Sequence, residues 1–424
     1  MRKKVAIVFL ILSVFLIGGG IFLSNKEKQD KLKAEEKAIE IKKEQEKILL
    51  EQIKTSFNQY VKTNKEAKIY NYVDNKYEVV GTVGQNEELE LENTEINLNT
   101  KYFKIKSLGY YISYKDVQRI EKLSDVNNRY KNYIVFNENI YTTSPTAFYD
   151  GDKKVYELNK SFEFPIIIKD TDKYYVEFNN RLLEIKASNV SKTEKKINTK
   201  EVPRDNIRTL TYHTIYNTKT EQCSNTVICH PIEQFDSHMK YLSENNYFTL
   251  TMDELEMFLD GKIQIPKKSI VITLDDGKYA INAVKIVEKY KVNATYFIIT
   301  SRYNVKDIET TYMNFESHTH NLHNNYKCSG GNQGGELLCS SREKILNDLK
   351  TSQKELGGAT AIAYPFFDFN NNAIKVLKEA GFKLAFVGQY NTNGYSNKKT
   401  NRMIIPRKTI FSYDKIETFI SYLK

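Results

Sequence analysis

Residues 270–277 read Ile-Val-Ile-Thr-Leu-Asp-Asp-Gly, an apolar run that ends abruptly in two carboxylates and a glycine. A short apolar run bounded by a turn residue is typical of a buried strand. Successive side chains on a strand point to opposite faces, so Asp275 and Asp276 can take different roles if the backbone turns where the strand ends. We therefore expect one carboxylate to bind a metal and the other to stay free as a base. An ordinary Asp-Gly turn is the alternative interpretation.

A histidine cluster follows this stretch. Half of the chain's six histidines lie in residues 316–323, which read Glu-Ser-His-Thr-His-Asn-Leu-His. Neutral imidazole is a common zinc ligand, and a carboxylate with two histidines leaves a fourth position open for water. Asp276, His318 and His323 would form such a site. A surface loop with adventitious metal binding is the alternative.

These residues resemble the NodB-like polysaccharide deacetylases, carbohydrate esterase family 4. Residues 273–277 are similar to the first motif of that family, Thr-Phe-Asp-Asp-Gly, in which the first aspartate is the catalytic base and the second binds the metal. His318 and His323 resemble the two histidines of the second motif, in the branch that spaces them five apart, so His320 is not expected to be a ligand. The resemblance covers roughly residues 207–423.

Residues 363–366, which read Ala-Tyr-Pro-Phe, resemble the third motif of the same family. The resemblance implies that Tyr364 and Pro365 bind the substrate. It also implies that the backbone N–H of Phe366 contributes to an oxyanion hole, where a fixed donor stabilises the charge that develops in the transition state.

Two departures from the family pattern concern catalysis. The third motif normally opens with an arginine that pairs with the catalytic aspartate, but Ala363 stands there, so Asp275 is expected to lack a partner that lowers its pKa. The last motif normally carries a histidine as general acid, yet no histidine follows His323. Arg407 lies in that region and could stabilise a charge, but it could not donate a proton. His213 is the remaining candidate acid, with a structural hydrogen bond as its alternative role.

The resemblance implies a metal-dependent hydrolase. Its cofactor would be Zn²⁺ or another divalent transition metal such as Co²⁺, which lowers the pKa of a bound water. Asp275 would take the proton as that water attacks the N-acetyl group of an N-acetylglucosamine polymer. Peptidoglycan is the favoured substrate, and an exopolysaccharide is the alternative. A catalytically weakened relative that only binds cell-wall glycans is the second hypothesis, motivated by the two departures.

Strands and helices alternate around the motifs. Apolar spacing predicts a helix over residues 282–290 and a strand over 294–299. The same pattern predicts a helix over 371–380 that ends at Gly381, followed by a strand over 383–387. Repeated units of this kind predict an α/β fold, a (β/α) barrel, with the motif residues on loops at the carboxyl ends of its strands. We assign residues 199–424 to this barrel.

The first 25 residues predict a membrane anchor. Three basic residues precede Val5–Leu23, an uncharged stretch long enough to cross the hydrocarbon core. The basic residues place the N-terminus in the cytoplasm and the bulk of the chain outside. A cleaved signal peptide is the alternative, although no Ala-x-Ala-like site is present. We therefore expect a single-pass membrane protein with an extracellular catalytic domain.

Between the anchor and the barrel the composition changes twice. Lysine and glutamate dominate residues 26–59, which predicts a charged helical stalk, and a solvated spacer is favoured over a coiled coil because the apolar stripe is only partial. Tyrosine, valine and isoleucine then alternate with charged residues, which predicts two all-β modules over 60–125 and 126–198. These modules resemble bacterial SH3-like wall-binding modules, and an inert spacer is the alternative.

Cysteines and charge agree with an extracellular address. Two local disulfides, Cys223 with Cys229 and Cys328 with Cys339, are expected, while free thiols and crosswise pairing are the alternatives. The net charge of +10 favours anionic wall polymers over nucleic acid as the partner, because the chain has no phosphate-binding loop and no RNA-binding signature.

Overall fold

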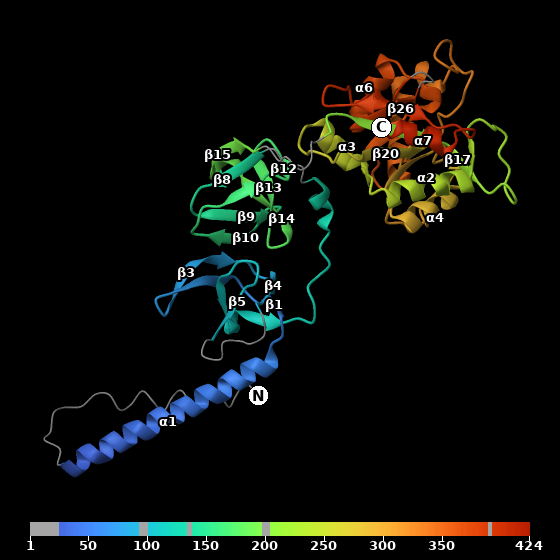
Figure 1. Ribbon diagram of the computed structural model, residues 1–424. Helices are drawn as coiled ribbons and strands as arrows, with labels where there is room; N and C mark the ends of the chain where they lie inside the picture. The colour runs from blue at the N-terminus through green and yellow to red at the C-terminus, as the bar shows by residue number, and fades with distance from the viewer. Residues whose placement is uncertain (1–24, 93–100, 134–137, 197–203, 389–391) are drawn as a thin grey trace. The chain divides into compact units, whose positions relative to one another are not determined.

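The computed structural model describes residues 25–92, 101–133, 138–196, 204–388 and 392–424. The chain divides into two compact units, Met1–Ser124 and Asp125–Lys424, and each is described by itself (Figure 1). Among the described residues, no helix combines the length and apolar character that a membrane span requires. The expected span Val5–Leu23 lies outside the described residues, so the anchor stays a prediction.

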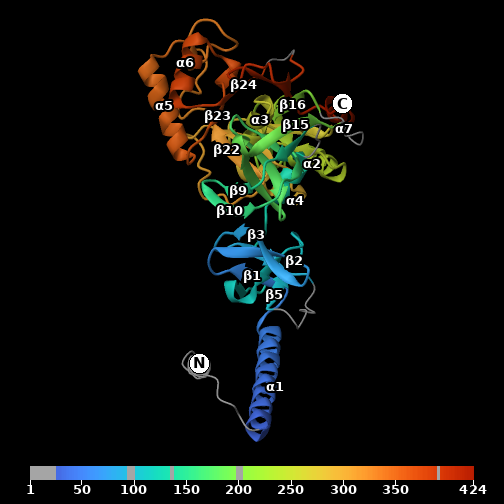
Figure 2. The same cartoon turned by 90° about the vertical axis from the view of Figure 1, so that its left-hand side faces the viewer.

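The stalk is one helix. The helix α1 runs from Asn25 to Ser56, as expected from its lysine and glutamate content, and is drawn in blue in Figure 2. Ile53, near its end, is buried. The large apolar side chains along its middle are 50–57% exposed, which agrees with a solvated helix: Leu32, Ile39, Ile41 and Ile48.

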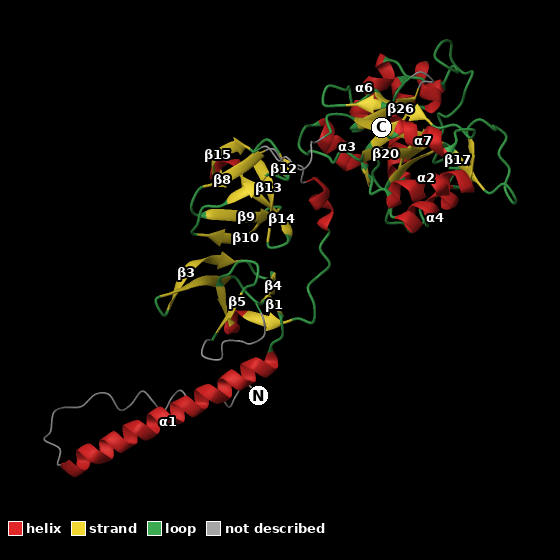
Figure 3. Cartoon of the chain, viewed as in Figure 1, coloured by secondary structure: helices red, strands yellow, loops and turns green. Residues whose placement is uncertain are grey.

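The rest of the first unit is all-β, as predicted, and its strands pair antiparallel (Figure 3). Alternate side chains such as Ile69, Phe103 and Ile112 are buried, which is the pattern of strands with one face in a core. One group of strands is β4 (Glu88–Glu90), β1 (Tyr60–Thr63) and β7 (Val117–Arg119). A short 3-10 turn at Tyr114–Asp116 lies directly before β7. The other is β3 (Lys76–Val83), β2 (Ala67–Val73), β6 (Tyr111–Ser113) and β5 (Tyr102–Lys104).

The second unit begins with a further all-β segment, which is also as predicted. Its strands form two antiparallel groups, and both the hairpin β13–β14 and the hairpin β5–β6 of the first unit pair antiparallel. The likeness to SH3 modules stays a prediction. The first group is β11 (Glu163–Pro165), β8 (Glu138–Thr142) and β15 (Val190–Lys195). The second is β12 (Ile168–Lys169), β13 (Lys173–Phe178), β14 (Arg181–Lys186), β9 (Thr146–Asp150) and β10 (Lys153–Leu158), with 3-10 turns at Asn128–Tyr133 and Ala187–Asn189.

A closed barrel of seven parallel strands follows, which confirms the predicted fold class. The last strand pairs back with the first, so the sheet closes on itself. Around the barrel the strands are β16 (Ile207–Tyr212), β20 (Ser269–Leu274), β21 (Ala294–Ile298), β22 (Met313–Ser317), β23 (Ala361–Ala363), β24 (Leu384–Gly388) and β26 (Ile405–Thr409). Short additions are β19 (Phe248–Thr249) on β20, β25 (Tyr395–Ser396) on β16, and the pair β17 (Thr214–Tyr216) with β18 (Cys229–Pro231).

Helices connect the strands and cover the barrel. The two helices expected from apolar spacing are α4 (Ala280–Tyr290) and α6 (Asn371–Ala380), and Gly381 ends α6 with a φ of 93°. Helices α5 (Arg342–Glu355) and α6 lie side by side (Figure 2). The remaining helices of the barrel are α2 (Ile232–Glu244), α3 (Met252–Leu259), α5 (Arg342–Glu355) and α7 (Ile416–Tyr422), with 3-10 turns at Glu336–Leu338 and Pro365–Phe367.

The alternation of side chains along β20 fixes which residues face the barrel interior. Ile270, Ile272 and Leu274 belong to a cluster with residues of α2 and α4 outside the barrel. Val271 instead packs with residues from the other strands, such as Phe297 and Phe386, inside it. Because the period is two, the residue after Leu274 faces the interior again. The strand therefore delivers its next side chain, a carboxylate, to the carboxyl end of the barrel lumen.

Candidate active site

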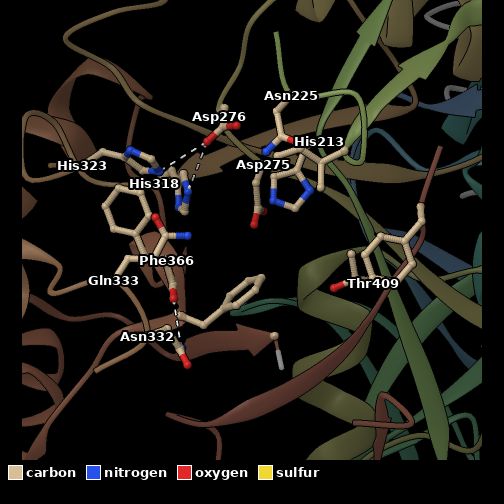
Figure 4. Close-up of a pocket in the computed structure, with 14 residues that line it drawn as sticks. His213, Asn225, Asp275, Asp276, His318, His323, Asn332, Gln333, Phe366 and Thr409 are labelled. Carbon is tan, nitrogen blue, oxygen red and sulfur yellow. Dashed lines mark hydrogen bonds and ion pairs between the residues drawn. The ribbon is translucent and has the colours of Figure 1, made fainter. Parts of the chain in front are cut away.

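The two aspartates diverge because the backbone turns between them. The N–H of Asp275 still donates to the carbonyl of Tyr212 on β16, at 3.0 Å, so this residue continues the strand. Asp276 has a φ of 79° and Gly277 a φ of 105°, both in the left-handed region. The carboxylates therefore point in different directions (Figure 4). This is the turn that the sequence predicted.

Asp276, His318 and His323 form the expected cluster of ligand atoms. One atom of each lies within 4.8 Å of the others. The Nε2 atoms of His318 and His323 are 3.7 and 3.3 Å from Oδ1 of Asp276 (Figure 4). Burial, the largest single influence, would raise the pKa of Asp276, but the hydrogen bond with His323 and the nearby imidazoles of His213, His323 and His318 together hold the pKa well below its usual range. A carboxylate with two imidazoles is a donor set that fits Zn²⁺ or Co²⁺.

The imidazole of His318 is prepared for metal binding. Its Nδ1 lies 2.8 Å from the carbonyl oxygen of Ala363 on β23, which can only accept a hydrogen bond. Nδ1 therefore carries the proton and Nε2 presents its lone pair to the cluster. Burial lowers the pKa of His318 to about 4, so the ring is neutral at physiological pH. Neutral imidazole is the form that binds a metal.

The loop between the two ligand histidines turns His320 away from the cluster. Thr319 has a φ of 71°, and the carboxylate of Asp348 accepts the backbone N–H groups of His320 and Asn321 at 2.8 and 2.7 Å. The Nδ1 atom of His320 lies 3.0 Å from the hydroxyl of Thr300. His320 is thus held outside the ligand set, as the spacing of the motif implied. Asp348 was not expected from the sequence, because its partners are backbone groups.

Arg407 corrects the expectation that Asp275 has no guanidinium partner. Two nitrogens of Arg407 donate to the two carboxylate oxygens of Asp275, at 2.6 and 2.7 Å, and both side chains are almost fully buried. Burial, the largest single influence, would raise the pKa of Asp275, but the guanidinium of Arg407, helped by His318 and His213, holds the pKa below its usual range. Arg407 is fully buried and does not line the cavity, so it lies where it can orient Asp275, and its expected catalytic role stays a prediction.

The third motif forms a tight turn, and of its expected site residues Phe366 lines the cavity. Phe366 has a φ of 58°, lines the cavity and packs its ring 4.3 Å from that of His323. Tyr364 and Pro365 are buried outside the cavity lining, and the hydroxyl of Tyr364 donates to the carbonyl of Met403 at 3.2 Å. Their side chains pack beneath the turn, and their expected contact with the substrate stays a prediction. The oxyanion role of the Phe366 N–H stays a prediction.

His213 lies in the same cavity as Asp275, Asp276, His318 and His323 (Figure 4). Its Nδ1 is buried and has no hydrogen-bond partner among the described residues. It comes directly after β16, whereas Asp275 comes after the neighbouring strand β20. Sequence reasoning missed further lining residues, which come from loops and from the ends of β24 and β26: Asn225, Ile228, Asn332, Gln333, Phe367, Gly388, Thr409 and Phe411.

The cysteines pair locally, as expected. Cys223 is bonded to Cys229 and Cys328 to Cys339, and their Cα atoms are 5.9 and 5.7 Å apart. The described residues contain no free cysteine. The crosswise pairing and the free thiols are thus excluded, and each bond closes one loop beside the cavity.

Comparison with known proteins agrees with this geometry. The poly-beta-1,6-N-acetyl-D-glucosamine N-deacetylase of Staphylococcus aureus strain MSSA476 is 34% identical over 175 residues, which are 36% of this chain and 59% of that protein. The protein of the same name from Staphylococcus epidermidis is 29% identical over 212 residues, 44% of this chain and 70% of that protein. The chain thus spans about three fifths of the length of the Staphylococcus aureus relative.

Solved structures of similar chains include the Streptococcus pyogenes deacetylase PplD, with a TM-score of 0.42 and 21% identity, over 53% of this chain and 100% of that chain. The polysaccharide deacetylase BC0361 from Bacillus cereus has a TM-score of 0.42 and 19% identity, over 85% of this chain and 100% of that chain. Residues 262–385 match the family described as polysaccharide deacetylase. By that match, the chain contains a polysaccharide deacetylase domain.

Proposed function

We propose that the chain is a metal-dependent N-deacetylase of an N-acetylglucosamine polymer. One observation carries this proposal: the ligand atoms of Asp276, His318 and His323 lie within 4.8 Å of one another in a cavity that Asp275 also lines. A separate carboxylate beside a three-ligand site is what metal-assisted hydrolysis of an amide requires. The names of the staphylococcal relatives support the same reaction.

Each residue of the cavity has a distinct task in this reaction. A divalent metal, when bound, would supply a Lewis acid and activate water. Asp275, kept ionised by Arg407, accepts the proton of the attacking water. The N–H of Phe366 stabilises the negative charge that develops on the carbonyl oxygen. We assign the protonation of the leaving amine to His213, because it lines the cavity and its Nδ1 has no hydrogen-bond partner among the described residues.

The substrate that we propose first is a β-1,6-linked N-acetylglucosamine polymer, since the relatives carry that name. Peptidoglycan, which the sequence favoured, remains the second candidate. The two differ in the linkage of the sugar that enters the cavity, and acetate release separates them. Purified protein supplied with zinc or cobalt should release acetate from β-1,6-linked oligomers, and Asp275→Asn should not. Acetate release from peptidoglycan but not from the β-1,6-linked oligomers would make peptidoglycan the substrate. Release from neither polymer would overturn the enzymatic function.

A glycan-binding protein without activity is the alternative. It was motivated by the lack of an arginine beside Asp275 and by the missing terminal histidine. The first of these reasons no longer applies, because Arg407 donates hydrogen bonds to both carboxylate oxygens of Asp275. Binding of the oligomers by wild-type protein without any acetate release would favour this alternative, whereas release with measurable turnover excludes it.

We propose that the site works outside the cytoplasm, at the cell membrane. The two disulfides support this location, because such bonds persist in oxidising compartments. The stretch Val5–Leu23 would hold the chain in the membrane. Intact cells labelled with a membrane-impermeant reagent should show labelled protein in the membrane fraction. Protein found only in the cytosol would contradict the location, and protein released to the medium would indicate a cleaved signal peptide.

A further inference from the structure

Two disulfide-closed loops contribute residues to the lining of the cavity. The loop closed by Cys223 and Cys229 supplies Asn225 and Ile228 to the lining. The loop closed by Cys328 and Cys339 supplies Asn332 and Gln333. Neither loop belongs to the motifs that hold the metal or the base. These parts of the lining thus come from separate segments whose ends are covalently fixed.

The second loop is also fixed from inside by a buried carboxylate. Asp368 is 2% exposed and follows the turn that contains Phe366. Its oxygens accept the backbone N–H groups of Asn332, of Gln333 at 3.1 Å and of Gly335 at 2.8 Å. Three donors converge on one carboxylate, so the backbone of the loop is held against the turn that we assign to the oxyanion hole.

The two amides of this loop differ in how they are used. The Nδ2 of Asn332 donates to the carbonyl of Phe366 at 3.1 Å, which ties the side chain to the turn. The side chain of Gln333 makes no hydrogen bond to another described residue, although its backbone is held on both sides. In Figure 4 its amide points into the cavity, near His318 and Phe366. A polar group is thus presented to the cavity on a rigid loop.

We propose that Gln333 is a specificity-determining residue that hydrogen-bonds a hydroxyl group of the sugar being deacetylated. The inference rests on the proposed function. An amide offers both a donor and an acceptor, as a sugar hydroxyl does, and it is uncharged like the N-acetylated substrate. Because Asp368 and the disulfide hold the loop before the substrate arrives, little entropy is lost when the contact forms.

Gln333→Ala tests the inference, with Asn325→Ala as its control. Asn325 is an exposed amide eight residues earlier that does not line the cavity. We expect Gln333→Ala to raise KM for N-acetylglucosamine oligomers about tenfold and to change kcat much less, because one neutral hydrogen bond is lost. The melting temperature and the zinc content should stay those of wild type, and Asn325→Ala should match wild type throughout.

A binding measurement keeps the inference separate from the proposed function. In the Asp275→Asn background, which cannot use its base, Gln333→Ala should raise the Kd for the oligomers about tenfold. Unchanged KM and unchanged Kd would overturn the role of Gln333 while leaving the enzymatic function intact. If wild type releases no acetate, the proposed function fails, and Kd alone then decides whether Gln333 contacts the sugar.

Discussion

Arg407 on β26 and Asp275 at the end of β20 form a buried, two-pronged ion pair, although 132 residues separate them in the sequence. Both strands flank β16, and both side chains point into the barrel lumen because β26 alternates Ile405, Arg407 and Thr409 inward. The guanidinium of Arg407 contacts the carboxylate of Asp275 and does not line the cavity. It keeps the base ionised and fixes its orientation without touching the substrate.

Loss of this pair should cost stability as well as activity. Arg407→Met leaves the Asp275 carboxylate buried and unpaired, so we expect the free energy of unfolding to fall by about 3–5 kcal/mol. Acetate release should fall with it. Chemical denaturation measures the change, and the double variant Asp275→Asn with Arg407→Met should lose much less than the sum of the single variants. Additive losses would show that the two side chains do not interact.

Metal binding should depend on two of the three histidines in the second motif. His318→Ala and His323→Ala should each lose bound zinc and acetate release, because each removes one ligand of the cluster. His320→Ala is the control, since His320 contacts Thr300 outside the cluster. Elemental analysis of purified protein checks the zinc content. Full zinc occupancy in His323→Ala, or its loss in His320→Ala, would contradict the ligand set.

A chelator should abolish acetate release by wild-type protein, and zinc or cobalt should restore it, because the carboxylate and imidazoles of the cluster fit either ion. The measurement is acetate release before chelation, after it and after metal is returned. Release that survives complete metal removal would rule out metal dependence.

Substitutions at two adjacent glycines test whether the carboxylate of Asp368 holds the loop closed by Cys328 and Cys339. Gly330 and Gly331 have φ values of 85° and 70°, so alanine is strained at both. A Cβ on Gly331 would lie 2.3 Å from Oδ1 of Asp368, whereas a Cβ on Gly330 would meet nothing within 4 Å. Gly331→Ala should therefore cost about 1–3 kcal/mol more stability than Gly330→Ala and should lower kcat/KM, because the loop must move. Equal effects of both substitutions would contradict the contact.

The motifs and the fold could be predicted from the sequence, because they depend on local patterns. The alternation along residues 270–275, the turn at Asp276 and the histidine spacing are all carried by neighbouring residues. Arg407 could not be assigned in this way, because its partner lies across a closed sheet, although the alternation of Ile405, Arg407 and Thr409 is a usable signal. A side chain whose hydrogen-bond partners are backbone groups leaves no recognisable pattern in the sequence.

The carboxylates of Asp348 and Asp368 are of that kind, since both accept backbone N–H groups of remote loops. The burial of Tyr364 and Pro365 could not be predicted for a related reason. The motif gives their identity but not the direction of their side chains, which the end of β23 turns into the core.

One buried acid should make stability depend on pH. Glu316, on β22, is 6% exposed, and burial raises its pKa to about 7. The folded protein then binds more protons than the unfolded chain between about pH 4.5 and about pH 7, so stability falls as pH rises through this window. The loss should reach at most about 3 kcal/mol. Glu316→Gln should remove it in urea unfolding across that range.

The comparison must be made as the difference between wild type and Glu316→Gln. Burial lowers the pKa of His230 to about 4 and that of His238 to about 3, and these groups act in the opposite direction. Both proteins contain them, so their effect cancels in the difference. An identical pH slope for the two proteins would show that Glu316 is ionised in the folded state.

The most direct test of the site is the acetate released from N-acetylglucosamine oligomers by wild type and by Asp275→Asn, at equal zinc content and saturating substrate. If Asp275 is the base beside the metal cluster, the rate should fall at least about a hundredfold while zinc stays bound by Asp276, His318 and His323. Equal rates for the two proteins would contradict the assignment of Asp275 and the division of roles between the paired aspartates.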